Sequence, residues 1–365
     1  MYTESPNRLL RRVVGVVDAL TAPHGVDRYV ELVAPAWSST EVRARIVSVA
    51  RTTPATVTMT LRPNANWAGF VAGQYVQLTV EIDGVRQTRC YSMANASSDS
   101  ATIELTVKAH PDGLVSNYLV QHADAGMVVG LSTAQGEFVL PAVRPERLLL
   151  VSGGSGITPV MSMLRTLCAE GHTGQVTFLH YAPTAHDMTY REELATIAAA
   201  NDNVRLVRVF TDQPGTGDAD GFLTNQQLAA VEPAWAQAQV YVCGPTPLMD
   251  AARGLYVAAG RPDQMHTEAF TLPQFVAEAG TVGGALRFSG AGRDVANDGR
   301  PILEQAETAG LAPEFGCRMG ICHTCVRPLR CGTVRDLVSG ELVTGDGQDI
   351  RICVSTPVGD ADVDL

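Results

Sequence analysis

Three closely spaced cysteines near the C-terminus constrain the fold of this chain more than any other feature. Cys317, Cys322 and Cys325 form the pattern C-x4-C-x2-C, and Cys353 follows after a long gap. Four thiolates at this spacing are typical of a plant-type [2Fe–2S] centre. A structural zinc site is the alternative, but such sites usually combine two short cysteine or histidine pairs, and this stretch offers one. The spacing therefore favours the iron–sulfur centre, with these four cysteines as its ligands.

The rest of the composition is that of a globular protein. The 365 residues are 45% hydrophobic and 18% charged, which suggests two or three folded domains. The formal net charge of −11 argues against a nucleic-acid partner and against simple adsorption to anionic lipid. No apolar run reaches the roughly 18 residues that a membrane span needs. With a cluster present, a reducing cytoplasm is the better interpretation, and a peripheral position at the inner membrane face stays open.

Residues 1–40 form an extension ahead of the first domain. Ser5 and Pro6 are suited to cap and begin a helix, and apolar residues recur at helical spacing from Leu9 to Leu20. The pattern predicts a helical extension. Two interpretations remain open, because such a helix either packs on the body of the protein or docks on a partner or a membrane surface.

Residues 41–145 have the pattern of a β domain. Short segments with alternating or β-branched character are separated by Gly, Pro, Asn and Asp, which favours an antiparallel β-barrel or a sandwich. The predicted strands are 42–49, 56–61, 75–82 and 102–107.

Four local motifs carry a resemblance to a known family. Arg89-Cys-Tyr-Ser92 ends a strand, and Gly113-Leu-Val-Ser116 follows the next one. Further along come Gly153-Gly-Ser-Gly-Ile-Thr-Pro159 and Cys243-Gly-Pro245. In this order the motifs resemble the ferredoxin–NADP⁺ reductase superfamily, whose flavin motif is R-x-Y-S/T. The resemblance implies that residues 41–145 form a flavin-binding β-barrel.

The resemblance also implies roles for individual flavin-binding residues. Arg89 would meet the flavin phosphates, Tyr91 would pack on the isoalloxazine ring, and Ser92 would hydrogen-bond near the flavin N5. Arginine forms forked bonds to phosphate and helix N-termini attract anions, which supports a pyrophosphate at Gly113–Ser116. A pyrophosphate site favours FAD, and FMN stays open because some relatives use it. The expected cofactor-binding residues here are Arg89, Cys90, Tyr91, Ser92, Lys108, Gly113, Leu114, Val115 and Ser116.

Residues 146–270 have the pattern of a nicotinamide-binding α/β domain. The apolar run Leu148–Val151 is typical of a strand buried on both faces, and it leads into a glycine-rich turn and a helix. Strand, glycine turn and helix together cradle a pyrophosphate. Further strands at 176–181, 204–210 and 239–243 predict a doubly wound parallel sheet. The residues expected to bind the dinucleotide at the turn are Gly153, Gly154, Gly156, Ile157, Thr158 and Pro159.

The resemblance places hydride transfer at the end of this domain. Cys243, Gly244 and Pro245 would lie at the nicotinamide, Phe270 would cover the flavin until the nicotinamide displaces it, and Glu268 would lie close by. In the alternative interpretation, Cys243 is only a small buried side chain that packs in the core and has no role at the nicotinamide. NADH and NADPH are not distinguished, because the stretch after the second strand has no clean arginine and no well-placed acid. The expected catalytic residues are Ser92, Cys243, Glu268 and Phe270.

The last part of the chain resembles a ferredoxin. Residues 271–284 are rich in Gly, Ala and Thr, the composition of a mobile linker. Residues 285–365 offer a hairpin, a helix over 302–309, the cysteine loop and further strands, in the order of the β-grasp ferredoxin fold. From Ala285 onward, 8 Arg against 12 Asp plus Glu give a charge of −4. Two interpretations stay open, because such a surplus either steers a basic partner or forms a solvated acidic face.

Three modules in this order predict one electron path, from NAD(P)H to the flavin, to the [2Fe–2S] centre and on to a partner protein. The resemblance is to reductase components of oxygenases and desaturases. The extension makes the chain most similar to the NAD(P)H oxidoreductase partner of membrane fatty acyl-CoA desaturases, whose contact with the membrane would be peripheral. The alternatives are the reductase of a Rieske or haem-thiolate oxygenase, a flavin oxidase or quinone reductase, and a redox-sensing protein.

Overall fold

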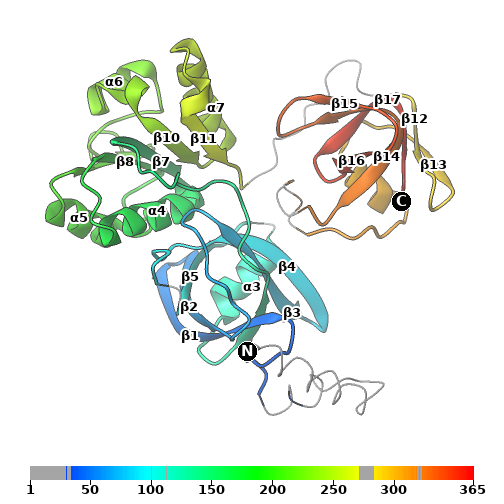
Figure 1. Cartoon of the computed structure of the whole chain (residues 1–365), viewed down its shortest axis with the longest axis horizontal. Coiled ribbons are helices and arrows are strands. Elements are labelled where there is room, and N and C mark those ends of the chain that lie inside the picture. The colour runs from blue at the N-terminus through cyan, green and yellow to red at the C-terminus, as the bar shows by residue number, and fades with distance from the viewer. Residues whose placement is uncertain are drawn as a thin grey trace, which may run out of the picture. The chain divides into compact units, whose positions relative to one another are not determined.

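Figure 1 shows a computed structural model of the chain, which describes residues 30, 34–99, 101–111, 113–270, 283–316, 318, 320 and 323–365. The helix predicted in residues 1–40 and most of the predicted linker lie outside the described residues. The chain divides into two compact units, one of Met1–Gly221 with Ala229–Tyr241 and one of Phe222–Leu228 with Val242–Leu365. No helix among the described residues is long and apolar enough to cross a membrane.

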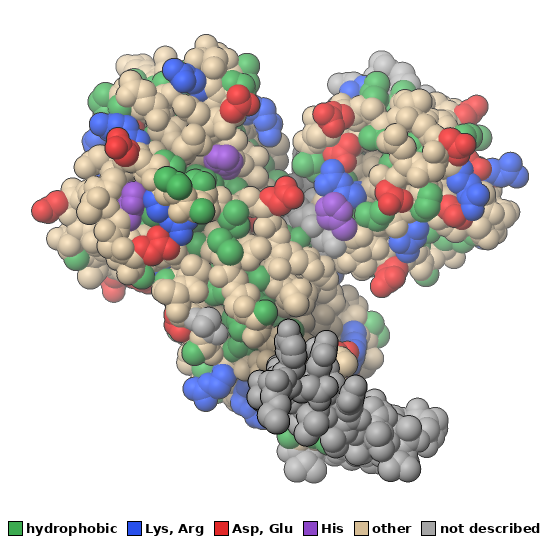
Figure 2. Space-filling view, in the orientation of Figure 1, with side chains coloured by type: hydrophobic (Ala, Val, Ile, Leu, Met, Phe, Trp, Pro, Cys, Tyr) green, Lys and Arg blue, Asp and Glu red, His purple; other side chains and the backbone are tan. Residues whose placement is uncertain are grey.

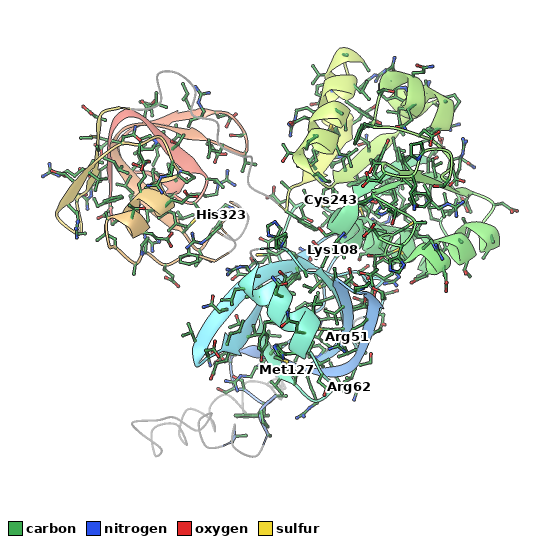
Figure 3. All side chains as sticks on the ribbon, turned by 180° about the vertical axis from the view of Figure 1, so that it is seen from behind. Arg51, Arg62, Lys108, Met127, Cys243 and His323 are labelled. Carbon is green, nitrogen blue, oxygen red and sulfur yellow. The ribbon has the colours of Figure 1, made fainter. Side chains whose placement is uncertain are left out.

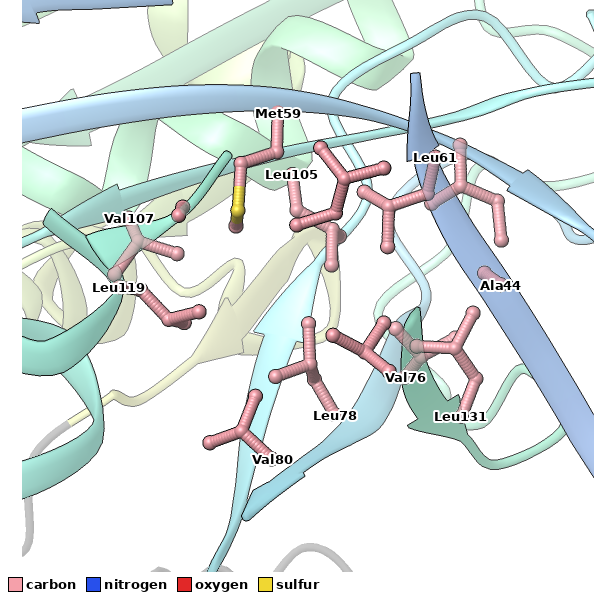
Figure 4. Close-up of a cluster of buried hydrophobic side chains, with 14 of the residues drawn as sticks. Ala44, Met59, Leu61, Val76, Leu78, Val80, Leu105, Val107, Leu119 and Leu131 are labelled. Atoms are coloured by element: carbon pink, nitrogen blue, oxygen red, sulfur yellow. The ribbon is translucent and has the colours of Figure 1, made fainter. Parts of the chain in front are cut away.

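The first domain is an antiparallel sheet that curls into a half-barrel around one hydrophobic core. Its strands run in the order β4-β3-β6-β1-β2-β5. Successive side chains of a strand point to opposite faces, so Val57, Met59 and Leu61 of β2 are fully buried. Leu119 of helix α3 packs into the same core (Figure 4). The elements are β1 (Val42–Thr53), β2 (Thr56–Pro63), β3 (Tyr75–Ile82), β4 (Val85–Ser92), β5 (Ile103–Lys108), α3 (Leu114–His122) and β6 (Val128–Leu131).

The nicotinamide-binding part is built on a sheet in the order β11-β10-β7-β8-β9. Strands β7, β8 and β9 pair in parallel, as the apolar run at Leu148–Val151 predicted. The elements are β7 (Arg147–Gly153), η1 (Gly154–Gly156), α4 (Ile157–Ala169), β8 (Gln175–Ala182), α5 (Arg191–Ala200), β9 (Val204–Phe210), α6 (Asn225–Val231), η2 (Trp235–Gln237), β10 (Gln239–Cys243), α7 (Thr246–Ala258), η3 (Pro262–Gln264) and β11 (Met265–Glu268).

The C-terminal domain is a mixed sheet in the order β13-β12-β17-β14-β15, with β16 paired to β14. Strand β12 pairs antiparallel with β13 and parallel with β17, so the last strand of the chain closes against the first of the domain. Asn297 exchanges backbone hydrogen bonds with Gly283 and Gly284, which ties these two glycines to the domain. The elements are β12 (Ala285–Phe288), β13 (Arg293–Ala296), α8 (Ile302–Thr308), β14 (Val326–Asp336), β15 (Leu342–Thr344), β16 (Gln348–Arg351) and β17 (Ser355–Val363).

The fold class predicted from the sequence is confirmed: a β-barrel domain, a parallel α/β domain and a β-grasp domain follow one another. The predicted strand at 42–49 was too short. In the structure β1 continues to Thr53, and its pairing with β2 contains two register irregularities. Strand β6 escaped prediction because its four residues offer too short a pattern.

Candidate functional site

The end of β4 presents the first group of predicted residues. Arg89 and Tyr91 lie two positions apart on the same strand, so their side chains share a face. Burial raises the pKa of the Tyr91 phenol far above its ordinary value, although the charge of Arg89 partly opposes this, so Tyr91 stays neutral. Ser92 is buried, Cys90 is half-buried, and a guanidinium nitrogen of Arg89 donates to the Thr88 carbonyl at 2.7 Å.

Helix α3 begins at a glycine that has no room for a side chain. A Cβ on Gly113 would lie 2.3 Å from the hydroxyl of Ser116, which itself donates to the Gly113 carbonyl at 3.2 Å. No side chain caps the helix start, and the leading N–H groups of a helix favour an anion. Leu114 is half exposed at the opening and Val115 is buried beneath it.

A cavity of about 530 Å³ opens at this helix start. Gly113 and Leu114 line it, together with Asp83 from the β3–β4 turn. The rings of Tyr118 and His122, one helical turn apart, line its wall in tilted contact, with centroids 5.0 Å apart. A second hollow of about 600 Å³ lies elsewhere on the barrel and is lined by none of the predicted site residues.

The glycine-rich turn follows β7 directly. Gly154 adopts a φ of +55°, a conformation that favours glycine, and no side chain caps the start of α4. Gly153, Gly156, Ile157, Thr158 and Pro159 are buried, so the turn presents backbone rather than side chains. The starts of α3 and α4 therefore both lack a side-chain cap, and a helix N-terminus of this kind favours an anion.

Cys243 and Glu268 are brought together in the second unit. Both side chains are buried, Cys243 at the end of β10 (Figure 3) and Glu268 at the end of β11. Burial raises the pKa of the Cys243 thiol well above its ordinary value, and the charge of Glu268 raises it further. The thiol is therefore neutral. Gly244 and Pro245 lead into α7, and Phe270 is half-buried.

Two of the four predicted cluster ligands fall within the described residues. Cys325 and Cys353 are buried in the core of the ferredoxin domain, whereas Cys317 and Cys322 lie outside the described residues. Gly320, inside the loop, adopts a φ of +74°, and a Cβ there would lie 2.7 Å from a methyl group of Val354. The loop therefore needs glycine at this position.

Arg351 ties this loop to the sheet. Its guanidinium donates to the Gly320 carbonyl at 2.6 Å and to the Asp336 carboxylate at 2.5 Å. On the rim of the loop the Arg318 guanidinium forms an ion pair with Glu307. The same guanidinium lies over the Phe315 ring, with Cζ 3.8 Å from the ring centre. The Phe315 side chain is 37% exposed. On the face shown in Figure 2, acidic and basic side chains are interspersed over this domain.

Comparison with known proteins identifies the family. Three family models match the chain in the order of its domains: an oxidoreductase FAD-binding domain over residues 45–140, an oxidoreductase NAD-binding domain over 150–254, and a 2Fe-2S iron-sulfur cluster binding domain over 287–358. An NADPH oxidoreductase of Mycobacterium tuberculosis is 37% identical over 351 residues, which are 95% of this chain and 90% of that protein. The chain belongs to the family of flavin-dependent NAD(P)H oxidoreductases that carry a [2Fe–2S] ferredoxin domain.

Two further proteins are similar to this reductase over most of its length. The glycine betaine monooxygenase reductase subunit of Pseudomonas aeruginosa is 31% identical over 81% of this chain and 87% of its own. The crystal structure of phthalate dioxygenase reductase matches with a TM-score of 0.60 at 25% identity, over 88% of this chain and 97% of that one. The predicted resemblance to reductases of this class is confirmed.

The reductase uses FAD, NAD(P)H and a [2Fe–2S] centre, and its described residues fit all three. The uncapped starts of α3 and α4 suit the pyrophosphates of FAD and of the dinucleotide. The buried thiols of Cys325 and Cys353 suit an iron–sulfur cluster, because cysteine thiolates are its usual ligands. When bound, the flavin accepts two electrons as a hydride and the cluster carries single electrons.

Sequence reasoning missed a polar pair beneath the glycine turn. Ser152 and His180 are opposite each other on β7 and β8, fully buried, with the Ser152 hydroxyl 2.8 Å from His180 Nδ1. Burial and the charge of Lys108 lower the pKa of His180 to about 3, so the ring is neutral. A histidine inside the otherwise apolar stretch of β8 was the signal available for this pair.

Proposed function

We propose that this reductase passes electrons from NAD(P)H through FAD and its [2Fe–2S] centre to the oxygenase component of a multicomponent system. The observation that carries this proposal is the agreement of two similar proteins, each matching more than four-fifths of this chain. One is named a monooxygenase reductase subunit and the other a dioxygenase reductase. Neither of these two proteins is named as the reductase of a fatty acyl-CoA desaturase. We therefore replace the expected desaturase partner with the alternative, an oxygenase.

We assign the flavin to the barrel face formed by β4 and α3. Arg89 pairs with the flavin phosphates, Tyr91 offers its neutral ring to the isoalloxazine, and Ser92 bonds near N5. The N–H groups at Gly113–Ser116 hold the pyrophosphate, since the helix start is uncapped. The cavity of about 530 Å³ beside them has room for the adenosine end, which favours FAD over FMN. We also assign to the flavin site the remaining residues expected from the sequence, Cys90, Lys108, Leu114 and Val115.

We assign the dinucleotide to the turn Gly153–Pro159, whose backbone N–H groups face its pyrophosphate. In the second unit, Cys243, Gly244 and Pro245 place the nicotinamide. Burial raises the pKa of the Cys243 thiol and the charge of Glu268 raises it further, so the thiol stays protonated. A neutral thiol holds the nicotinamide without placing a negative charge at the reacting atoms. Phe270 occupies the flavin face until the nicotinamide displaces it.

We assign the iron–sulfur cluster to four cysteines, Cys317, Cys322, Cys325 and Cys353. The exposed ring of Phe315, in the loop that carries the first of them, is the proposed contact with the partner protein.

An anaerobic titration tests the reductase half of the proposal. Purified protein is titrated with NADH and separately with NADPH while flavin absorbance and the low-temperature EPR spectrum are recorded. Bleaching of the flavin with growth of a rhombic [2Fe–2S] signal supports the electron path, and the better donor identifies the dinucleotide. Flavin bleaching without a cluster signal would remove the ferredoxin from the path.

Reconstitution tests the partner half. The reductase is combined with candidate oxygenase components and, separately, with membrane-bound acyl-CoA desaturases from the same organism, and NAD(P)H-dependent product is measured. Product with an oxygenase supports the proposal. Product with a desaturase alone overturns it and restores the first expectation. Rapid reduction of cytochrome c without either partner separates a turning-over reductase from a redox sensor.

A further inference from the structure

Polar, largely half-buried side chains form the seam, which is the interface between the barrel and helix α4. Arg165 of α4 sends one guanidinium nitrogen across to Glu104 of β5 at 2.7 Å and to the Ala94 carbonyl at 2.7 Å. Its other two nitrogens hold Glu193 of α5 in a fork at 2.7 and 2.6 Å. The Arg165 side chain is only 16% exposed. A forked arginine fixes direction as well as distance.

Tyr190 closes the same cluster from the nicotinamide-binding side. Its hydroxyl donates to Glu104 at 2.9 Å and also lies against the hydroxyl of Thr106. Its ring lies under the Arg165 guanidinium, 4.9 Å from ring centre to Cζ. Tyr190 adopts a φ of +59°, a left-handed conformation that is strained for a residue with a side chain. Strain of this kind persists where surrounding contacts enforce it, and such sites are often functional.

A second set of bonds continues the seam along α4. The Ser162 hydroxyl donates to the Asn95 carbonyl at 2.7 Å, and the Thr166 hydroxyl accepts from the Ser97 N–H at 3.0 Å. Ser162, Arg165 and Thr166 are three and four residues apart, so they share one face of the helix. That face is therefore docked on the barrel by polar contacts along its length.

The polar contacts of Arg165, Glu104 and Tyr190 connect the two proposed cofactor sites through strand β5 and helix α4. Glu104, Thr106 and Lys108 alternate along β5, so they lie on one face, and the last of them ends the strand (Figure 3). On the other side, Arg165 follows Thr158 of the glycine turn by seven residues, about two turns of the same helix. A shift at Arg165 therefore moves the dinucleotide turn relative to the barrel.

We propose that Arg165, Glu104 and Tyr190 are positioning residues for hydride transfer, which set the separation between the flavin on the barrel and the dinucleotide on the glycine turn. The inference rests on the proposed cofactor sites. It predicts that loosening the seam lowers the rate of hydride transfer rather than the affinity for either cofactor, because displacement by about 1 Å costs up to a hundredfold in rate.

The test uses three variants that keep the side chain close to its original size. Arg165→Lys removes the forked guanidinium, Glu104→Gln removes the negative charge, and Tyr190→Phe removes the hydroxyl. Arg208→Lys is the matched control, because Arg208 also forks onto one carboxylate, Asp218, entirely within the nicotinamide-binding part. Anaerobic stopped-flow mixing gives the limiting rate of flavin reduction and the Kd of the reduced dinucleotide. The long-wavelength charge-transfer absorbance between nicotinamide and flavin reports their stacking directly.

We expect the limiting rate to fall by about tenfold or more and the charge-transfer absorbance to weaken. The Kd stays within about twofold and the FAD content is unchanged, while Arg208→Lys behaves as the unmodified reductase. An unchanged rate and absorbance in FAD-loaded Glu104→Gln and Tyr190→Phe would overturn the inference, even if Arg165→Lys fails to fold. Failure of both dinucleotides to reduce the unmodified protein would instead overturn the proposed function.

Discussion

At the scale of single residues, two buried titratable groups are each held in one protonation state. Cys243 is neutral because it is buried beside Glu268, and His180 is neutral because it is buried near Lys108. Both side chains are therefore uncharged near neutral pH. Hydride transfer needs no general acid or base, so the proposed role of Cys243 is to orient the nicotinamide rather than to exchange a proton.

The Cys243 thiol is expected to resist alkylation. Burial and the charge of Glu268 raise its pKa well above the ordinary value, so at pH 8.5 little thiolate forms. Treatment of the folded reductase with iodoacetamide, followed by peptide mass spectrometry, should show Cys243 modified about tenfold or more slowly than the exposed Cys331. Glu268→Gln should speed the modification. Equal rates at the two cysteines in folded protein would contradict the assignment.

Gly113 is expected to be essential for flavin binding. Gly113→Ala places a Cβ 2.3 Å from the Ser116 hydroxyl, so the start of α3 must shift away from the proposed pyrophosphate. We predict that the affinity of the apoprotein for FAD, measured by quenching of flavin fluorescence, falls by about tenfold or more, which is about 1.4 kcal/mol. Gly254→Ala is the control, because nothing lies within 4 Å of a Cβ at that helical position. Normal FAD binding by Gly113→Ala would exclude this phosphate site.

At the scale of elements, the cluster loop depends on its connection to β14 and β16. Burial alone would raise the pKa of Asp336, but the N–H of Ser339 and the Arg351 guanidinium hold it below its ordinary value. A depressed pKa stabilises the fold above about pH 4, and this stabilisation is lost as the pH falls through the folded pKa. Retention of the cluster should therefore weaken only below about pH 4.

Arg351→Leu is expected to loosen the loop without affecting the flavin. The change removes the bond to the Gly320 carbonyl and leaves Asp336 buried without its charge partner. The cost is about 1–3 kcal/mol, less than for a fully buried pair because the Arg351 side chain is 28% exposed.

Visible absorbance in air should show the cluster of Arg351→Leu decaying severalfold faster, with FAD retained. The control is Arg330→Leu, since Arg330 pairs with Asp364 on the surface of the same domain. Equal decay in both variants would mean that Arg351 does not support the loop.

At the scale of the whole molecule, the three domains are expected to act as separable stages. Cys353→Ser should abolish the rhombic EPR signal and the delivery of electrons to an oxygenase, because a cluster ligand is lost. Reduction of the flavin by NAD(P)H should continue at the unmodified rate, since the residues proposed to bind the flavin and the dinucleotide lie outside the ferredoxin domain. Cys331→Ser, at an exposed cysteine in the same domain, should leave both stages intact. Oxygenase turnover by Cys353→Ser would mean that the ferredoxin is not the exit.

Much of this molecule could be predicted because its motifs are local in the sequence. The cysteine spacing indicated the ferredoxin domain, the run Leu148–Val151 indicated a buried parallel strand, and the glycine turn after it indicated the dinucleotide site. Each of these patterns lies within one short segment, where backbone geometry and side-chain spacing are linked directly.

Only the tertiary structure decided which distant residues meet. Arg165 reaches Glu104 across 61 positions of sequence and Tyr190 reaches it across 86, and no periodicity marks either pairing. The strained backbone of Tyr190 and the neutral state of His180 likewise depend on neighbours brought together by folding. The sequence by itself determined the modules and their cofactors, whereas the alignment of the barrel with the glycine turn depends on long-range packing.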